Sequence, residues 1–469
     1  MSIESINPAT GEVIETFEPF TAVQIDETLT RARKAYLNWR TTTFAERAAL
    51  LRRVGEVLRA QKAELGRTAT LEMGKSITES VAEVEKCAWN CDYYAENAEA
   101  FLAPEKVATN AAESYVEFTP IGVVLAIMPW NFPYWQVMRF AAPAIMAGNA
   151  AVLKHASNVS RCALEIERVF REAGAPEGLF NTILVPGAEV EQIIADRRVA
   201  AVTLTGSTPA GIAVAGAAGR AIKKSVLELG GSDAFIVLAD ADLDDAAEMA
   251  VRSRFQNAGQ SCIAAKRFIV EETVADAFAT KFAEAASKWR MGDPMDAQTQ
   301  MGPMARADLR DSLVDQVDRS LKMGATVVLG GKASDGAGAF YPPTIITGVT
   351  DDMPVFREET FGPVAAVIRA RDAEHAIELA NDSEFGLGGN LWTRNLDRAR
   401  QLAQRLESGA VFINGMTASD PRLPFGGVKQ SGYGRELSSF GIREFVNIQT
   451  VWIGPASAAS APPVSAAAE

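Results

Sequence analysis

The feature that most constrains the fold is an alternation of short apolar runs with helical segments, which begins at Ile121. Residues 121–128 form an apolar run, as expected for a strand buried on both faces, and residues 134–147 are predicted to form a helix. Further strands are predicted at residues 150–153, 180–184, 199–205, 225–229, 235–238 and 267–271. Because strands separated by helices pair in parallel, the pattern predicts an α/β fold built on parallel sheets.

The alternation restarts after Lys224, and a chain of 469 residues is too long for one simple core. A second α/β domain is therefore predicted from about residue 230 to about residue 435. After an irregular opening, helices are predicted at residues 25–39, 45–65 and 77–100. The alternating run at residues 115–118 predicts an edge strand or a hairpin, and the C-terminal residues, rich in Ala, Ser and Pro, predict a disordered tail.

The charge and the apolar segments argue against two classes of partner. A net charge of −13 is unfavourable for binding nucleic acid or anionic membranes. The apolar run at residues 121–130 is too short to span a bilayer, and the run at residues 140–153 is broken by Pro143, Gly148 and Asn149. The N-terminal residues have no signal-peptide pattern, so we expect a cytoplasmic protein.

Four cysteines in a chain of this length do not make a disulfide framework. Cys87 and Cys91 stand one helical turn apart, but His155 and His375 are the only histidines, so no metal site is predicted. Cys262 differs because it follows a Gly-Gln-Ser turn that would leave its N–H free to donate. An unpaired cysteine is usually a small buried hydrophobe, so Cys262 alone is compatible with a nucleophile or with an inert residue.

Four other stretches could assist a nucleophile at Cys262, and each also has a plainer interpretation. Asn131 follows the first predicted strand and could donate to an oxyanion, or it could shape a turn. Glu228 stands in an apolar run and could act as a general base if buried, or it could be an exposed edge residue. Residues 206–211 form a glycine-rich strand-to-helix junction suited to phosphate, although no Gly-x-Gly-x-x-Gly fingerprint is present. The fourth stretch is the acidic loop around Glu359.

Taken together, these stretches resemble the aldehyde dehydrogenase superfamily over nearly the whole chain. The motifs that carry the resemblance are Pro-Trp-Asn-Phe-Pro at 129–133, Thr-Gly-Ser at 205–207, Leu-Glu-Leu-Gly-Gly at 227–231, Gly-Gln-Ser-Cys at 259–262, Glu-Glu-Thr-Phe-Gly-Pro at 358–363 and Pro-Phe-Gly-Gly-Val-Lys-Gln-Ser-Gly-Tyr-Gly-Arg-Glu at 424–436. The resemblance implies an α/β aldehyde dehydrogenase fold with an atypical Rossmann-like cofactor domain, an α/β catalytic domain and a small β oligomerisation element. The implied boundaries are 1–101 and 121–229 for the cofactor domain, 230–436 for the catalytic domain, 102–120 and 437–453 for the oligomerisation element, and 454–469 for the disordered tail.

The same resemblance implies a role for each candidate. Cys262 would be the nucleophile that forms a thiohemiacetal and then a thioester, while Asn131 and the Cys262 N–H would hold the oxyanion. Glu228 would activate the water that hydrolyses the thioester, with Glu436 on a proton route. The implied cofactor contacts are Met128, Pro129, Trp130, Lys154, His155, Ala156, Ser157, Gly206, Ser207, Leu229, Glu359 and Phe361.

The loop after Lys154 predicts the preferred cofactor. Family members that prefer NAD commonly carry an acid three residues after this lysine, where this chain has Ser157. A 2′-phosphate would meet a cation and a hydroxyl instead of a like charge, so NADP should be accepted and preferred, with NAD as the second cofactor. His155 replaces the proline that is usual in this loop.

The helix after the first motif predicts the substrate class. If it begins near Phe132, Trp135 and Arg139 line one face and place a guanidinium on the wall of the substrate tunnel. An inward Arg139 would bind a distal carboxylate, as resemblance to bacterial succinate-semialdehyde dehydrogenases also implies, and Ser419 would lie near the tunnel mouth. We therefore expect oxidation of succinate semialdehyde to succinate by a homodimer or homotetramer.

Other activities remain open from the sequence. Gln256 stands where some semialdehyde dehydrogenases carry a second arginine, so glutarate semialdehyde or a simple aliphatic or aromatic aldehyde is an alternative substrate. A non-redox cysteine acyl hydrolase and a non-catalytic protein that has kept the fold are alternatives of another class.

Overall fold

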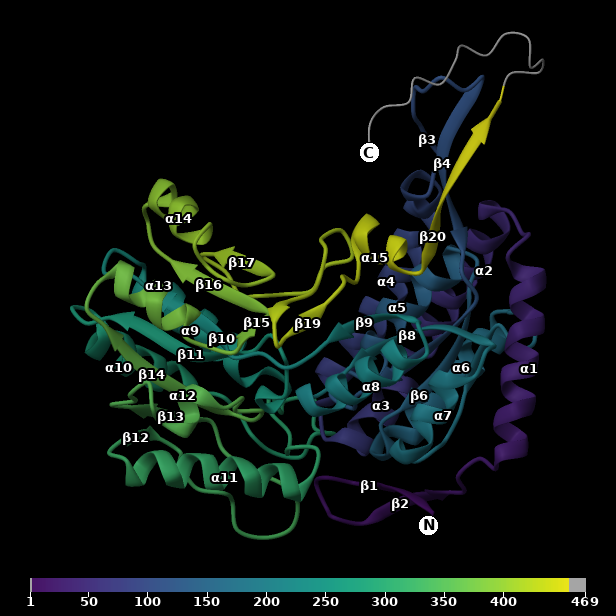
Figure 1. The fold of residues 1–469 in the computed structure, drawn as a ribbon. Helices are drawn as coiled ribbons and strands as arrows, with labels where there is room; N and C mark the ends of the chain where they lie inside the picture. Colours follow the sequence, from purple (N-terminus) through teal and green to yellow (C-terminus); the bar gives the residue numbers. More distant parts are fainter. Residues whose placement is uncertain (1, 455–469) are drawn as a thin grey trace.

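The structure is a computed structural model that describes residues 2–454, so the tail predicted to be disordered lies, apart from Gly454, outside the described residues. Two large sheets stand side by side, each accompanied by helices, and a small third sheet projects from one end (Figure 1). This is the mixed α/β architecture that the strand–helix alternation predicted.

The first large sheet has six strands in the order β19-β9-β8-β5-β6-β7, and only β19 runs antiparallel to its neighbour. The strands are β5 (Val123–Met128), β6 (Ala150–His155), β7 (Phe180–Thr182), β8 (Val199–Thr205), β9 (Lys224–Glu228) and β19 (Gly432–Tyr433). The helical elements between them are α5 (Trp135–Met146), η1 (Ser157–Val159), α6 (Ser160–Glu172), η2 (Gly187–Glu189), α7 (Val190–Ala195) and α8 (Thr208–Arg220). Because β5 is central and buried on both faces, its sequence is almost entirely apolar.

The second large sheet has seven strands in the order β12-β13-β14-β11-β10-β16-β17, with only β12 antiparallel. The strands are β10 (Asp233–Val237), β11 (Ala265–Glu271), β12 (Thr326–Leu329), β13 (Thr344–Thr347), β14 (Val364–Ala370), β16 (Gly388–Trp392) and β17 (Ala410–Ile413). The helices are α9 (Leu243–Phe255), α10 (Ala275–Ala286), α11 (Ala307–Lys322), α12 (Pro354–Arg357), α13 (Ala373–Asn381) and α14 (Leu396–Ala403). Phe235 and Val237 of β10 enter one core cluster and Ile236 enters another, so this sheet also buries both faces.

The remaining elements surround these sheets. At the N-terminus, β1 (Ile3–Ile6) pairs with β2 (Val13–Phe17), and helices α1 (Ala22–Trp39), α2 (Phe44–Ala60), α3 (Lys62–Met73) and α4 (Ile77–Phe101) follow. The third sheet contains β3 (Glu105–Lys106), β4 (Glu113–Pro120) and β20 (Val446–Ile453), with α15 (Ser438–Glu444) leading into β20. Two short strands, β15 (Phe385–Gly386) and β18 (Val428–Lys429), form a separate pair.

Three local predictions need correction. The helix predicted over residues 45–65 is two helices, α2 and α3, separated at Gln61, whose backbone leaves helical geometry. The run at residues 115–118 belongs to an antiparallel β3–β4 hairpin, as one alternative predicted, but it is not an edge strand, because β4 lies between β3 and β20. The predicted irregular opening contains the β1–β2 hairpin. The second correction depends on pairing with a strand more than 300 residues away along the chain, which no local pattern contains.

Within residues 2–454, none of the helices combines the length and apolar character needed to cross a bilayer. The same part of the chain contains no group of three or more His, Cys, Asp or Glu side chains arranged to hold a metal ion.

Candidate active site

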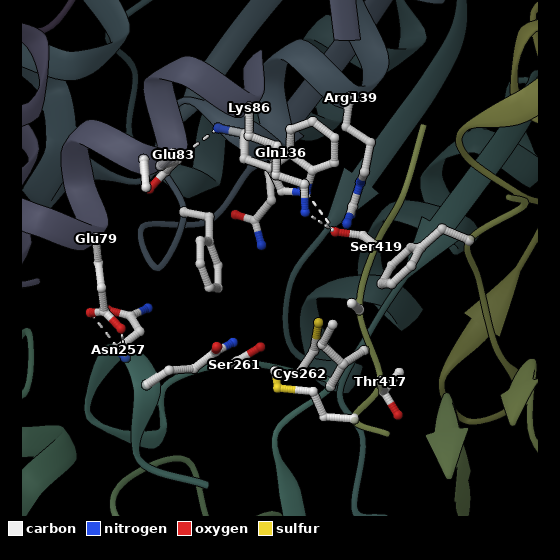
Figure 2. Close-up of a pocket in the computed structure, with 18 residues that line it drawn as sticks. Glu79, Glu83, Lys86, Gln136, Arg139, Asn257, Ser261, Cys262, Thr417 and Ser419 are labelled. Atoms are coloured by element: carbon white, nitrogen blue, oxygen red, sulfur yellow. Dashed lines mark hydrogen bonds between the residues drawn. The ribbon is translucent and has the colours of Figure 1, made fainter. Parts of the chain in front are cut away.

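Cys262 lies where two cavities meet. One cavity, of about 270 Å³, is lined by α4, α5 and the loops that carry Asn257 and Ser419, and we call it the substrate cavity (Figure 2). The other, of about 240 Å³, is lined by the carboxyl ends of β5, β8 and β9 and by Glu359 and Phe361, and we call it the cofactor cavity. Ligand sites in parallel sheets are expected at that edge. Since Cys262 lines both cavities, a group in either one can approach its sulfur.

The segment before Cys262 has an unusual backbone. After α9 ends, Asn257, Ala258 and Gly259 have positive φ angles of 51°, 51° and 71°. A left-handed conformation costs a non-glycine residue about 1–3 kcal/mol, so the surrounding structure must enforce it. Asn257 Nδ2 donates to the carbonyls of Asn131 and Gln260 at 2.8 and 3.1 Å. Gly259 is required as well, because a Cβ there would lie 2.4 Å from the Gly362 carbonyl oxygen.

The environment of Cys262 favours the neutral thiol in this structure. Burial raises its pKa to about 12, and the positive charges of Arg139 and Lys266 oppose part of this effect. Lys266 is fully buried and its ammonium donates to the carbonyls of Ser261, Cys262 and Ala264 at 3.0, 2.9 and 3.2 Å. Lys266 was not predicted from the sequence, because β11 also contains Arg267 and Glu271 and the lysine therefore does not stand out.

Asn131 is buried and its amide orientation is fixed from both ends. Its Nδ2 donates to the Gln260 carbonyl at 2.9 Å, and its Oδ1 accepts from Gln136 Nε2 at 3.0 Å. One Nδ2 proton is therefore left for a ligand. Within residues 2–454 the Cys262 N–H makes no hydrogen bond, as the Gly-Gln-Ser turn predicted. Two N–H donors are consequently available near the sulfur.

Glu228 and Glu436 form a buried acidic pair beside Arg139. Glu228 ends β9 with 2% of its surface exposed, and neither of its carboxyl oxygens has a hydrogen-bond partner within the described chain. Burial, and secondarily the charge of Glu436, raise the pKa of Glu228 well above its usual range. Burial also raises the pKa of Glu436, against the effect of Arg139. Glu228 is therefore buried, as required for a raised-pKa base, and is not the exposed edge residue that the plainer interpretation assumed.

Arg139 points inward from α5 but is not free. Its Nε pairs with Glu436 Oε2, its Nη2 donates to Thr205 Oγ1 at 3.3 Å, and its guanidinium lies 4.4 Å from the Phe425 ring centroid. The side chain lines the substrate cavity with 2% of the residue exposed. The expectation of an inward arginine is met, but the sequence did not indicate that Glu436 already balances its charge.

The other side chains predicted for the substrate also face this cavity. Trp135 Nε1 donates to Ser419 Oγ at 3.0 Å. Lys86 of α4 donates to the same oxygen at 2.8 Å, and Figure 2 shows Lys86, Arg139 and Ser419 on one side of the cavity with Cys262 below them. Lys86 was not predicted to face the cavity, because a lysine on an amphipathic helix usually marks the solvated face.

The cofactor cavity gathers most of the residues predicted for the cofactor. Its lining includes Pro129, Trp130, Asn131, Gly206, Ser207, Leu229, Glu359 and Phe361. Glu359 Oε1 accepts from the Gly231 N–H at 3.0 Å and lies 3.6 Å from Lys266 Nζ, and the Trp130 and Phe361 rings meet edge to face. Ser207 precedes α8 and uses no side-chain oxygen to cap it, so the helix N–H groups there remain open to an anion. These donors, the acid and the flat aromatic walls fit a nicotinamide dinucleotide.

The loop at β6 lies outside both cavities. Lys154 is half-buried, Ala156 is half-buried and Ser157 is exposed, so these residues are open to a ligand that extends beyond the cofactor cavity. Met128 is buried at the end of β5.

His155 is turned into the protein. Its Nε2 lies 2.9 Å from the Pro133 carbonyl oxygen, and its Nδ1 accepts from the Ala156 N–H at 2.9 Å. We assign the Nε2–H tautomer on these contacts, and burial lowers the pKa of His155 to about 4. The ring thus joins β6 to the Asn131 loop, and only the backbone of His155 can face a cofactor.

The sequence pattern of the Aldehyde dehydrogenase family matches residues 1–451. A succinate semialdehyde dehydrogenase [NAD(P)+] of Escherichia coli is 53% identical over 96% of this chain and 97% of its own length. A probable succinate-semialdehyde dehydrogenase [NADP(+)] of Synechocystis sp. is 51% identical over 97% of this chain and its whole length.

The chain is also similar to a solved structure over nearly its whole length. The crystal structure of succinic semialdehyde dehydrogenase from Streptococcus pyogenes in complex with NADP+ is 42% identical, with a TM-score of 0.94 over 97% of this chain and all of that one. The family match over residues 1–451 includes both large sheets and every motif around Cys262. The chain therefore belongs to the aldehyde dehydrogenase family.

Proposed function

We propose that the protein oxidises succinate semialdehyde to succinate, with NADP+ as the preferred cofactor and NAD+ as the second. The observation that carries the proposal is Cys262 at the junction of a dinucleotide-compatible cavity and a cavity whose wall holds Arg139. The names of the Escherichia coli and Synechocystis relatives support the substrate and the cofactor. Glutarate semialdehyde and uncharged aldehydes are the alternative substrates.

The first half of the reaction uses Cys262 and Asn131. The Cys262 sulfur, once deprotonated, attacks the aldehyde carbon, so that a C–S bond forms and the carbonyl π electrons move to oxygen. Asn131 Nδ2 and the Cys262 N–H donate to this oxyanion. The oxyanion then collapses to a thioester, and NADP+, when bound in the cofactor cavity, would supply the acceptor for the hydride that leaves this carbon. Glu359, held by Lys266 and the Gly231 N–H, would bind the ribose next to the nicotinamide.

The second half uses Glu228. A water molecule attacks the thioester carbon while Glu228 accepts its proton, and the C–S bond breaks to release succinate and the thiolate. Glu228 must be a carboxylate for this step. After it has taken the proton from water, it can pass that proton on toward Glu436, which is paired with Arg139. A non-redox acyl hydrolase would use the same two residues, but it would leave the cofactor cavity without a purpose.

The test of this proposal is the initial rate of cofactor reduction by the wild-type protein. We expect a higher kcat/KM with succinate semialdehyde than with butanal, and a higher value with NADP+ than with NAD+. Equal values for the two aldehydes would contradict the substrate assignment while leaving the dehydrogenase chemistry intact. Absence of reduction with every aldehyde would favour the hydrolase alternative.

A charge at position 157 should reverse the cofactor preference. Ser157→Glu places a carboxylate beside the predicted 2′-phosphate site, and like charges brought together cost several kcal/mol. We expect kcat/KM for NADP+ to fall by roughly 30-fold or more, while the value for NAD+ changes little. Ser157→Gln has the same size without the charge and should keep the preference for NADP+. Equal losses with both cofactors would show that the loop was only distorted.

Removal of Arg139 should reduce selectivity for the carboxylate. Arg139→Ala is expected to lower kcat/KM for succinate semialdehyde by roughly 10- to 100-fold, because the distal carboxylate of the substrate loses the buried cation that binds it. The butanal value should fall less, although Glu436 loses its cation in both reactions. Arg139→Ala also leaves the buried Glu436 carboxylate without a cation and should lower the melting temperature. Adding Glu436→Gln removes this carboxylate, so the double variant should recover the melting temperature but not the selectivity. Selectivity that survives Arg139→Ala would contradict its role.

We also propose that the protein is a cytoplasmic homodimer or homotetramer that associates through residues 102–120 and 437–453. The exposed apolar side chains of β20, Ile448, Trp452 and Ile453, support this surface because they would be buried by a second copy. The division into domains at residues 101, 120, 229 and 436 stays a prediction.

A further inference from the structure

Lys86 and Ser419 form a polar cluster on the wall of the substrate cavity. The Lys86 ammonium donates to Ser419 Oγ at 2.8 Å and lies 4.2 Å from the centroid of the Trp135 ring. Trp135 Nε1 donates to the same oxygen at 3.0 Å. The position of Ser419 is thus fixed from two helices, α4 and α5, and the ammonium is held against an aromatic face.

This cluster has unused hydrogen-bond donors. Lys86 has three N–H groups and uses one on Ser419. Ser419 Oγ accepts two hydrogen bonds, and no acceptor within residues 2–454 takes its hydroxyl proton. An oxygen anion in the cavity could therefore receive hydrogen bonds from both residues.

Lys86 also has no counterion in the described part of the chain. The two carboxylic acids that act on the charge of Lys86 are Glu83 and Asp420. Glu83 is paired with Lys75, and Asp420 is paired with Arg422 at 2.7 Å. Arg139 differs, because its charge is balanced by Glu436. A partly buried cation without a counterion gains more from an arriving anion than one already in an ion pair.

We propose that Lys86, together with the Ser419 hydroxyl, binds the distal carboxylate of the semialdehyde as a second cation beside Arg139. This inference rests on the proposed function and adds the residue that supplies the uncompensated charge. Glu79 lies on another side of the cavity, where it accepts from the Asn257 N–H at 3.0 Å (Figure 2). The cationic side chains that line the cavity within the described residues are Lys86 and Arg139, so the positive charge that attracts an anionic substrate lies on the side opposite Glu79.

The experiment compares kcat/KM for succinate semialdehyde and for butanal in Lys86→Gln, Lys86→Arg and Lys62→Gln. Lys86→Gln should lower the semialdehyde value by roughly 10- to 100-fold, mainly through KM, and the butanal value by much less. Lys86→Arg keeps the charge and should recover most of the loss. Lys62→Gln removes the same charge from a solvent-exposed pair with Glu85 and should change neither value.

The pH dependence provides a readout that a structural role would not produce. Burial, and secondarily the charge of Arg139, lower the pKa of Lys86 to about 8, while Cys87, Asp420 and Glu83 oppose this when ionised. The substrate carboxylate stays ionised throughout this range. Selectivity for the semialdehyde should therefore fall as pH rises through the pKa of Lys86 and should be independent of pH in Lys86→Gln.

The outcomes separate this inference from the proposed function. Wild-type selectivity that persists in Lys86→Gln overturns the role of Lys86 and leaves the substrate assignment standing. Equal losses for both aldehydes in Lys86→Gln also overturn it, because they indicate a structural defect. A wild-type protein without selectivity overturns both.

Discussion

Replacing Cys262 with alanine is expected to abolish aldehyde-dependent cofactor reduction, lowering kcat by roughly 10³-fold or more. No other cysteine can substitute, because Cys87, Cys91 and Cys162 are fully buried and burial raises their pKa values. The change removes one sulfur atom from a half-buried position, so the fold should persist. NADP+ binding followed by calorimetry should remain close to that of wild type.

Cys91→Ala is the matched control for this substitution. It removes the same atom from the packed core of α4 and should cost about 1–3 kcal/mol of stability without loss of activity. Activity retained by Cys262→Ala would contradict the covalent mechanism. Activity lost equally in both variants would indicate that cysteine removal acts through folding.

Glu228→Gln should separate the two halves of the reaction. The amide keeps the size of the buried side chain but cannot accept a proton from water, so steady-state turnover should fall by roughly 10²- to 10⁴-fold. Thioester formation does not require Glu228 as the water-activating base, so stopped-flow absorbance should record a burst of about one NADPH per active site. Glu358→Gln changes a half-buried acid paired with Arg319 and should leave both phases unchanged. A variant that shows neither burst nor turnover would contradict the assignment to deacylation.

Wild type and Glu228→Gln should also differ in the pH dependence of steady-state turnover. Because the pKa of Glu228 is raised, its basic form becomes populated only as pH rises, and steady-state turnover should increase toward alkaline pH. The pKa of Cys262, at about 12, makes the burst rate rise with pH as well. The burst in Glu228→Gln should keep its pH dependence, while the steady-state increase assigned to Glu228 should disappear.

The sequence was sufficient for much of the fold because the strands of both large sheets are buried. Burial on both faces gives continuous apolar runs, such as β5, that are visible without any alignment. The sequence was insufficient where a strand pairs with another strand that is far away along the chain. The position of β4 inside the third sheet depends on β20, and the break at Gln61 between α2 and α3 has neither glycine nor proline to mark it.

The motifs predicted which residues belong to the site, but not how their side chains contact one another. Each motif names a side chain, but the ion pair between Arg139 and Glu436 joins α5 to a loop almost 300 residues later. Lys86 had no motif at all, and its inward direction follows from the packing of α4 against α5. The orientation of His155 likewise depends on the Pro133 carbonyl of a neighbouring loop. Charge balance in the site is thus a property of the tertiary structure.

The most direct test of the central claim is the intact mass of Glu228→Gln after mixing with NADP+ and succinate semialdehyde, followed by peptide mapping. We predict one added succinyl group on the peptide that contains Cys262, formed together with about one NADPH per active site. The adduct should be absent without NADP+ and absent when Cys262→Ala is added to the variant. A protein that reduces NADP+ but carries no adduct, or carries it on another residue, would contradict the account.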